Sequence, residues 1–207
     1  MKFKCTQCAK CCTQFNQQDG GVSLFEWEKN KIEQFGATAE PYAVFDINGT
    51  LVAYEFIMRK SPCTFLDDKL CSIYENRPLA CKLFPLRYFR FLPKEDRFVY
   101  ELGDSSGHDE EMVELLKQPG QIAALKEYIG EDMLLHALQS QFTASKLIHL
   151  LSQLRASSVQ SFQGKQVVSL FSYCKKNGIL SREWVKEFIQ NHNENKDAKL
   201  FVEQHNF

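Results

Sequence analysis

Hydrophobic and polar positions change their pattern along the chain, and the change predicts two parts of different character. From 131 to 155 apolar residues recur at the spacing of one helix face. Shorter helical patterns cover 165–176 and 181–192, and Asn177-Gly178 separates them. The expected buried positions of the long helix are Leu134, Leu135, Leu138, Phe142, Leu147, Ile148, Leu151 and Leu154. We therefore predict an all-α helical region over 109–207, after a boundary near residue 108.

The first part of the chain has a helical pattern that starts shortly after Gly20-Gly21. Ser23 and Glu26 have the spacing of a capping box, which predicts a helix start. The helix would run to about Phe35, and Gly36 would follow its last turn as the C′ glycine. Its expected buried side consists of Leu24, Trp27, Ile32 and Phe35.

Two β-hairpins are predicted in the same part. Asn48-Gly49 separates the β-rich runs 43–47 and 50–57, and a type I′ turn needs the positive φ angles that Asn-Gly tolerates. A second hairpin pairs 86–92 with 97–102, with the turn at 93–96. Pro78 suits the first turn of a short helix carrying Cys81, which Pro85 would end. The fold class is therefore α+β, a small domain with β-hairpins over 1–108 followed by helices.

The composition limits which binding partners and which cellular compartment we expect for the protein. The chain has 207 residues, 44% of them apolar, so it can form a stable hydrophobic core without disulfide bonds. Its net charge of −1 provides no field that recruits nucleic acid, and nucleic-acid binding is not expected. We find no secretory signal and no apolar run long enough to span a membrane. The expectation is a cytoplasmic protein with no membrane partner.

Seven of the eight cysteines lie in the first 81 residues, in two blocks. Thiols of cytoplasmic proteins stay reduced, and clusters of them more often bind metal than form disulfides, although the even count leaves a disulfide framework open. Thiolates are soft ligands that suit zinc and iron–sulfur clusters. The first block also matches the start of a ferredoxin motif, whose x3-Cys-Pro continuation is missing. The candidate metal ligands are Cys5, Cys8, Cys11, Cys12, Cys63, Cys71 and Cys81.

Adjacent Cys11 and Cys12 bear on the number of metals. In extended backbone their side chains would point to opposite faces, and both could serve one ion only in a tight local conformation. We therefore expect two ions, two corners of a larger cluster, or one ion with a spare thiol.

Four further residues bear on the predicted metal site. Seven thiols are one short of two four-cysteine sites, so His108 or Asp104 could supply the eighth ligand, although a lone loop histidine is usually just solvated. Cys174 lies in an apolar helical context and is predicted to be a small buried hydrophobe. Arg77 is expected to bond backbone carbonyls or a carboxylate near the cysteines.

The combined motifs resemble the YkgJ family of cysteine-cluster proteins. They read Cys5-x2-Cys8-x2-Cys11-Cys12, then Pro62-Cys63-x-Phe65-Leu66, then Cys71-x-Ile73-Tyr74-x2-Arg77-Pro78-x2-Cys81-x2-Phe84-Pro85. The resemblance implies a zinc- or iron-chelating domain that uses the seven cysteines. Many relatives carry a further Cys-Pro-Gly after the second hairpin, whereas 102–108 of this chain contains no cysteine.

The sequence therefore predicts a metal-binding protein of unassigned biological role, with zinc, iron or an iron–sulfur cluster as cofactor. The alternative is an enzyme, either an iron–sulfur oxidoreductase or a lysine methylase-like protein modifier, because flagellin lysine N-methylase resembles the family in its cysteine region. No catalytic residue is identified, so enzymatic activity is left open. The expected partners are a metal ion and a protein that binds the C-terminal helices.

Overall fold

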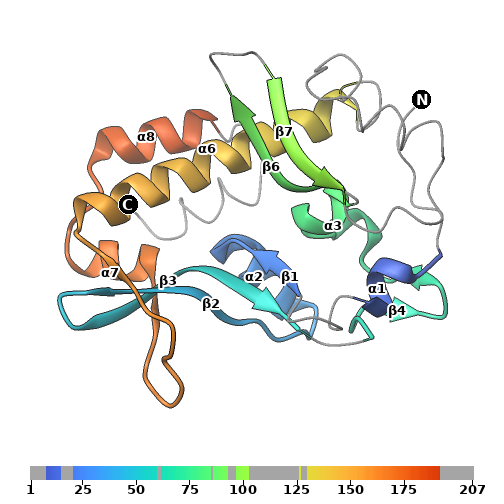
Figure 1. The fold of residues 1–207 in the computed structure, drawn as a ribbon, viewed down its shortest axis with the longest axis horizontal. Coiled ribbons are helices and arrows are strands. Elements are labelled where there is room, and N and C mark those ends of the chain that lie inside the picture. Colours follow the sequence, from blue (N-terminus) through green and yellow to red (C-terminus); the bar gives the residue numbers. More distant parts are fainter. Residues whose placement is uncertain are drawn as a thin grey trace. The chain divides into compact units, whose positions relative to one another are not determined.

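Two compact units make up the fold, and each is formed by two separate stretches of chain. A computed structural model describes residues 8–14, 21–59, 62–84, 86–92, 97–102, 126 and 130–191 (Figure 1). The first unit comprises Met1–Gly20 and Lys60–Phe142, and the second comprises Gly21–Arg59 and Thr143–Phe207. Helices and mainly antiparallel strands confirm the predicted α+β class. The division predicted near residue 108 falls within 103–125, outside the described residues, and stays a prediction.

The second unit is built on the first predicted hairpin, β2 (Glu40–Ile47) and β3 (Thr50–Met58). Ile47 pairs with Thr50, so the loop has two residues. Asn48 and Gly49 have φ angles of 52° and 83°, as a type I′ turn requires. The Gly49 N–H donates to Oδ1 of Asp46 at 2.8 Å. The hairpin and its turn are therefore confirmed.

Three short strands extend this hairpin into a mixed sheet. β1 (Val22–Leu24) pairs antiparallel with the end of β3, and Val22 lies opposite Met58. β8 (Ser157–Ser158) pairs antiparallel with β2, and β9 (Val168–Ser169) pairs parallel with β3. The region predicted to be all-helical thus also contributes two strands. Each has only two residues, too few to produce a period-2 pattern in the sequence.

Helix α2 (Glu26–Gln34) begins differently from the prediction. Ser23 lies in β1, and the N-cap residue is Phe25. The N–H of Phe25 donates to Oε2 of Glu28 at 3.1 Å, so the carboxylate at N3 satisfies the first orphan donor. The Ser23–Glu26 capping box was therefore wrong by two residues.

The end of α2 follows the prediction. Gly36 has φ +88°, and its N–H donates to Glu33 O at 3.0 Å while the Ala37 N–H donates to Ile32 O at 3.3 Å. These are the two bonds of a Schellman motif. Ile32 and Ala37 are both buried, whereas Phe35, expected on the buried side, is exposed.

Helices α6 (Glu131–Gln153), α7 (Leu170–Lys176) and α8 (Arg182–Asn191) confirm the three helical patterns, with one shifted start. The helix predicted from 165 begins at Leu170 because β9 occupies Val168–Ser169 and Ser169 then caps α7. Among the apolar positions of α6, Leu134, Leu147 and Leu151 are buried. Leu135 and Ile148 are exposed, so the apolar pattern is wider than the buried face.

An aromatic core joins the two stretches of the second unit. Trp27 of α2 meets Phe171 and Phe188 in edge-to-face contacts with centroids 6.3 and 5.8 Å apart. Such pairs contribute roughly 0.5–1.5 kcal/mol beyond the burial of their area. Cys174 is buried in this core, which confirms its reading as a small hydrophobe. Other members are Ile47, Val52, Leu147, Leu150, Leu151, Leu170 and Val185.

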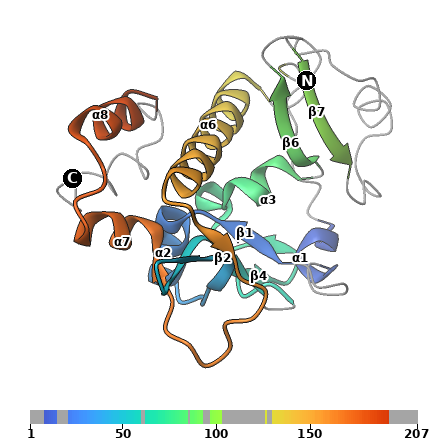
Figure 2. The ribbon, with the colours of Figure 1, turned by 60° about the vertical axis from the view of Figure 1, so that its left-hand side comes forward.

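The first unit contains short elements around the cysteines. They are α1 (Lys10–Gln14), β4 (Leu66–Asp67), β5 (Leu70–Cys71), the 3₁₀ turn η1 (Tyr74–Asn76) and α3 (Leu79–Leu83). The second hairpin, β6 (Leu86–Leu92) and β7 (Arg97–Leu102), has the predicted bounds (Figure 1, Figure 2). Its turn at 93–96 and Pro85 lie outside the described residues. Pro78 is the N-cap of α3, next to its predicted place in the first turn.

Candidate metal centre

Cys11 and Cys12 lie side by side in helix α1 rather than in extended backbone. The helix follows Ala9, whose φ is 58°, and the Thr13 N–H and hydroxyl both donate to Ala9 O at 3.0 Å. In this tight turn the Sγ atoms of Cys11 and Cys12 are 3.7 Å apart. The premise that the two side chains diverge was therefore wrong, because it assumed an extended segment.

The spacing of these two sulfurs fits a single ion. In a tetrahedral zinc site with Zn–S bonds of about 2.3 Å, two ligand sulfurs are about 3.8 Å apart. The 3.7 Å between Cys11 and Cys12 matches that edge. The pair can therefore act as two donors to one metal without a change in its spacing.

The second cysteine block is tied to the first through the backbone. The N–H of Cys63 donates to Cys12 O at 2.8 Å. The chain then turns, and the Leu66 N–H donates to Cys63 O at 3.0 Å. Burial raises the pKa of Cys63, and the backbone N–H groups of Phe65 and Leu66 partly offset this rise. Such N–H donors stabilise a thiolate.

Cys71 and Cys81 approach from two further elements. Cys71 ends β5 and pairs with Leu66 of β4, so the short β4–β5 hairpin brings it back toward Cys63. Cys81 lies in the first turn of α3, where its N–H donates to Pro78 O at 3.0 Å. Four separate segments therefore bring half-buried cysteines to the same unit.

Electrostatic interactions indicate that these thiols share one environment. The hydrogen bond with Cys12 lowers the pKa of Cys11 to about 7 and raises that of Cys12. Burial raises the pKa of Cys81, and the charges of Cys63, Cys11 and Cys71 raise it further. Cys12 is likewise affected by Cys63 and Cys81. Thiolates that repel one another in this way are stabilised by a cation placed among them.

Arg77 provides a fixed positive charge in this environment. Its Nε–H donates to Tyr74 O at 2.8 Å, and its guanidinium carbon lies 3.7 Å from the centre of the Tyr74 ring. The Arg77 charge is one of the causes that lower the pKa of Cys11 and limit the rise for Cys81. The expected bond to a backbone carbonyl is confirmed.

Of the remaining predicted candidates, Cys8 lies among the described residues. Cys8 is exposed, and Cys5, Asp104 and His108 lie outside the described residues. Within the part of the chain that the structure describes, no three Cys, His, Asp or Glu side chains are already arranged to hold one ion.

Sequence reasoning missed the backbone groups of the centre. The Cys12 carbonyl and the Phe65 and Leu66 N–H groups have no side-chain signature, so no motif could identify them. The positive φ of Ala9, which leads into α1, was equally hidden because alanine rarely adopts it.

The comparisons with known proteins identify the cysteine region. Residues 4–105 match the family model CxxCxxCC, described as "Putative zinc- or iron-chelating domain". Searches of curated proteins and of solved structures gave no match. None of the helices in the described ranges is both long and apolar enough to cross a membrane. The match confirms the resemblance seen in the motifs: residues 4–105 of the chain are similar to this zinc- or iron-chelating domain model.

Proposed function

We propose that this protein chelates zinc or iron through the thiolates of its first unit, with Cys11 and Cys12 as two donors to the same ion. The observation that carries the proposal is their Sγ–Sγ separation of 3.7 Å, the edge of a tetrahedral thiolate site. Cys63, Cys71 and Cys81 supply further thiolates from their own segments. Cys5 and Cys8 complete the proposed ligand set.

The chemistry of the donors supports a metal rather than an unliganded thiol cluster. Several half-buried thiols that raise one another's pKa are costly to ionise together, and a bound cation removes that cost. Zinc and iron both accept soft thiolates. We propose the cytoplasm as the compartment, since thiols there stay reduced and available.

The test is elemental analysis with a visible spectrum on protein purified without oxygen. We expect stoichiometric zinc in a colourless protein, or iron with thiolate charge-transfer absorption. The variants Cys63→Ser and Cys81→Ser should lose most of the metal, because each removes a ligand next to the Cys11–Cys12 pair.

Cys174→Ala is the matched control. Cys174 belongs to the second unit, and burial raises its pKa to about 12, so it stays protonated at neutral pH. Its removal should leave the metal content unchanged. Wild-type metal content in both Cys63→Ser and Cys81→Ser would overturn the ligand assignment.

A further inference from the structure

Cys11 and Cys12 are neighbouring thiols whose spacing is set by the fold. Their Sγ atoms are 3.7 Å apart, and both residues are partly exposed, so a small molecule in solvent can reach them. The N–H and the hydroxyl of Thr13 both donate to Ala9 O at 3.0 Å, which closes the turn that carries the pair. The Cys12 carbonyl also accepts from the Cys63 N–H at 2.8 Å. The two sulfurs are therefore held next to each other before any ligand binds.

The geometry of α1 opposes closure of this pair into a disulfide. The Cα atoms of consecutive residues are about 3.8 Å apart. A disulfide needs a Cα–Cα separation of roughly 4.4–6.8 Å, so a bond between Cys11 and Cys12 would require α1 to distort. The pair therefore stays a dithiol under conditions in which cysteines at wider spacing form a disulfide.

Within the described residues, the pair supplies two donors but not a complete metal cage. No three Cys, His, Asp or Glu side chains in that part of the chain are arranged to hold one ion. A ligand that binds two thiolates and needs no third protein donor fits this arrangement as it stands. Trivalent arsenic with one organic substituent is such a ligand, because it is soft, as thiolates are, and has two bonds left for sulfur.

We propose that Cys11 and Cys12 form a binding site for monosubstituted trivalent arsenicals, in which one arsenic atom bridges the two sulfurs. This site goes beyond the proposed chelation of zinc or iron, although it uses two of the same sulfurs. A bound arsenical therefore excludes the metal from this pair, and a bound metal excludes the arsenical.

The reaction exchanges two hydroxyl groups on arsenic for two thiolates. In an arsonous acid, R–As(OH)2, both As–O bonds break, together with the S–H bonds of Cys11 and Cys12. Two As–S bonds form, and the two protons leave with the two hydroxyl groups as water. Arsenic stays trivalent, so no oxidant or reductant takes part. The second As–S bond forms between groups that α1 already holds together, so a monothiol from solution competes poorly for the arsenic.

The test uses phenylarsine oxide and the full-length chain, purified without oxygen and stripped of metal with a chelator. Intact-mass spectrometry counts the bound arsenical, and a tryptic digest locates it. Trypsin cleaves after lysine, so Cys11 and Cys12 are the cysteines of peptide 11–29, whereas the two cysteines before Lys10 fall in peptide 5–10. We expect one arsenical on peptide 11–29 alone, which excess glutathione leaves bound and a small dithiol removes.

Variants and denaturation separate this site from ordinary thiol reactivity. Cys11→Ser and Cys12→Ser should each lose the arsenical to glutathione, because only one As–S bond then remains. Cys174→Ala, which removes a buried thiol of the second unit, should retain it as the wild type does. In denaturing urea the affinity of the wild-type chain should fall by about tenfold, because the spacing of the two side chains is no longer fixed.

Three results would each refute the proposal. They are an arsenical found on peptide 5–10 or linking two peptides, retention of the arsenical in glutathione by Cys11→Ser and Cys12→Ser, and an affinity that urea leaves unchanged. The first and third results come from the wild-type chain, so they decide the question even if a variant fails to fold.

Competition with zinc separates this inference from the proposed function. If peptide 11–29 binds the arsenical and saturating zinc does not reduce that binding, the pair is not part of the metal site, and the arsenical site stands. If Cys63→Ser and Cys81→Ser lose metal but peptide 11–29 does not retain the arsenical, only the arsenical site is wrong.

Discussion

At the scale of single residues, Ser23 illustrates how a distant partner decides a side chain's role. Its hydroxyl donates to Oε1 of Glu55 at 2.8 Å, between neighbouring strands β1 and β3. Burial raises the pKa of Glu55, and the bond from Ser23 partly offsets that rise. The residue expected to cap a helix instead stabilises a carboxylate in the sheet.

Ser23→Ala should destabilise the protein in a pH-dependent way. The raised pKa means that folding favours protonated Glu55, so this stability is present at low pH and is lost as pH rises through the folded pKa. Removing the Ser23 hydroxyl raises the folded-state pKa of Glu55 further, so the loss of folding stability becomes larger at pH values above that pKa. We expect the free energy of unfolding to fall by about 1–3 kcal/mol at neutral pH and by less near pH 4.

Urea unfolding at the two pH values measures this difference. Ser23→Thr keeps the hydroxyl and serves as the control. An equal loss for Ser23→Ala at both pH values would contradict the role given to Glu55.

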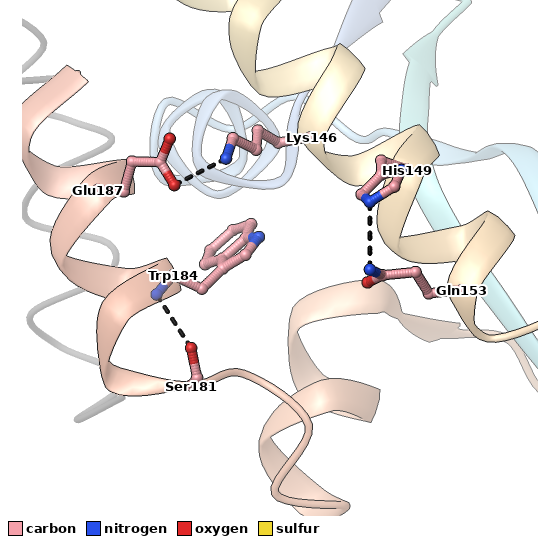
Figure 3. Close-up of polar contacts among 6 residues, drawn as sticks. All are labelled: Lys146, His149, Gln153, Ser181, Trp184 and Glu187. Carbon is pink, nitrogen blue, oxygen red and sulfur yellow. Dashed lines mark hydrogen bonds and ion pairs between the residues drawn. The ribbon is translucent and has the colours of Figure 1, made fainter.

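At the scale of elements, α8 shows which interactions hold a short helix in place. The Ser181 hydroxyl accepts from the Trp184 N–H at 3.1 Å, and Lys146 of α6 pairs with Glu187 at 2.7 Å (Figure 3). That ion pair is partly exposed and contributes less than about 1 kcal/mol. Trp184 stacks on Phe188 with ring centroids 5.3 Å apart. Aromatic packing and the Ser181 cap therefore contribute more to holding α8 in place than the ion pair does.

Ser181→Ala removes the N-cap of α8 and should lower the free energy of unfolding by about 1 kcal/mol. Thermal unfolding followed by tryptophan fluorescence measures the change, since Trp184 lies in the first turn of the helix. Ser181→Asp keeps a capping acceptor and should stay near wild-type stability. Equal destabilisation by Ala and Asp would show that the cap is not the cause.

At the scale of the whole molecule, the second unit depends on residues from two stretches that are far apart in the chain. Trp27, Ile47 and Val52 come from the segment between the cysteine blocks, and their core partners include Phe171 and Phe188. The segment 21–59 therefore loses much of its apolar cover when the C-terminal helices are removed.

A fragment of residues 1–108 tests the predicted domain division directly. Trp27 is its one tryptophan, and we expect red-shifted emission and no cooperative transition for the 21–59 segment. The full-length Trp184→Phe variant, with the same single tryptophan, is the control and should emit from a buried environment. Blue-shifted emission and cooperative unfolding of the fragment would support an independent domain at 1–108.

Whether the sequence predicted a feature depended on how far apart in the chain its interacting residues lie. The type I′ turn at Asn48-Gly49 and the end of α2 at Gly36 are set by a few neighbouring residues, and both were predicted. The pairing of β9 with β3 and the bond from Cys63 to Cys12 depend on partners far along the chain, and no local pattern indicates them. The cysteine spacing predicted a ligand set, which stays a prediction, whereas no local pattern predicted the helical geometry that brings Cys11 and Cys12 together.

The pairing of β1 with the end of β3 has a consequence for the assembly of the cysteines. Val22 lies opposite Met58, and a Cβ at Gly21 would come within 2.8 Å of Met58 O, so the two ends of the segment 21–59 lie close together. Once β1 has paired with β3, the loop that closes when Cys12 meets Cys63 shortens from about 50 to about 15 residues. The shorter loop lowers the entropic cost of closure by about 1 kcal/mol. Folding of a segment without cysteines thus raises the effective concentration of one ligand block for the other.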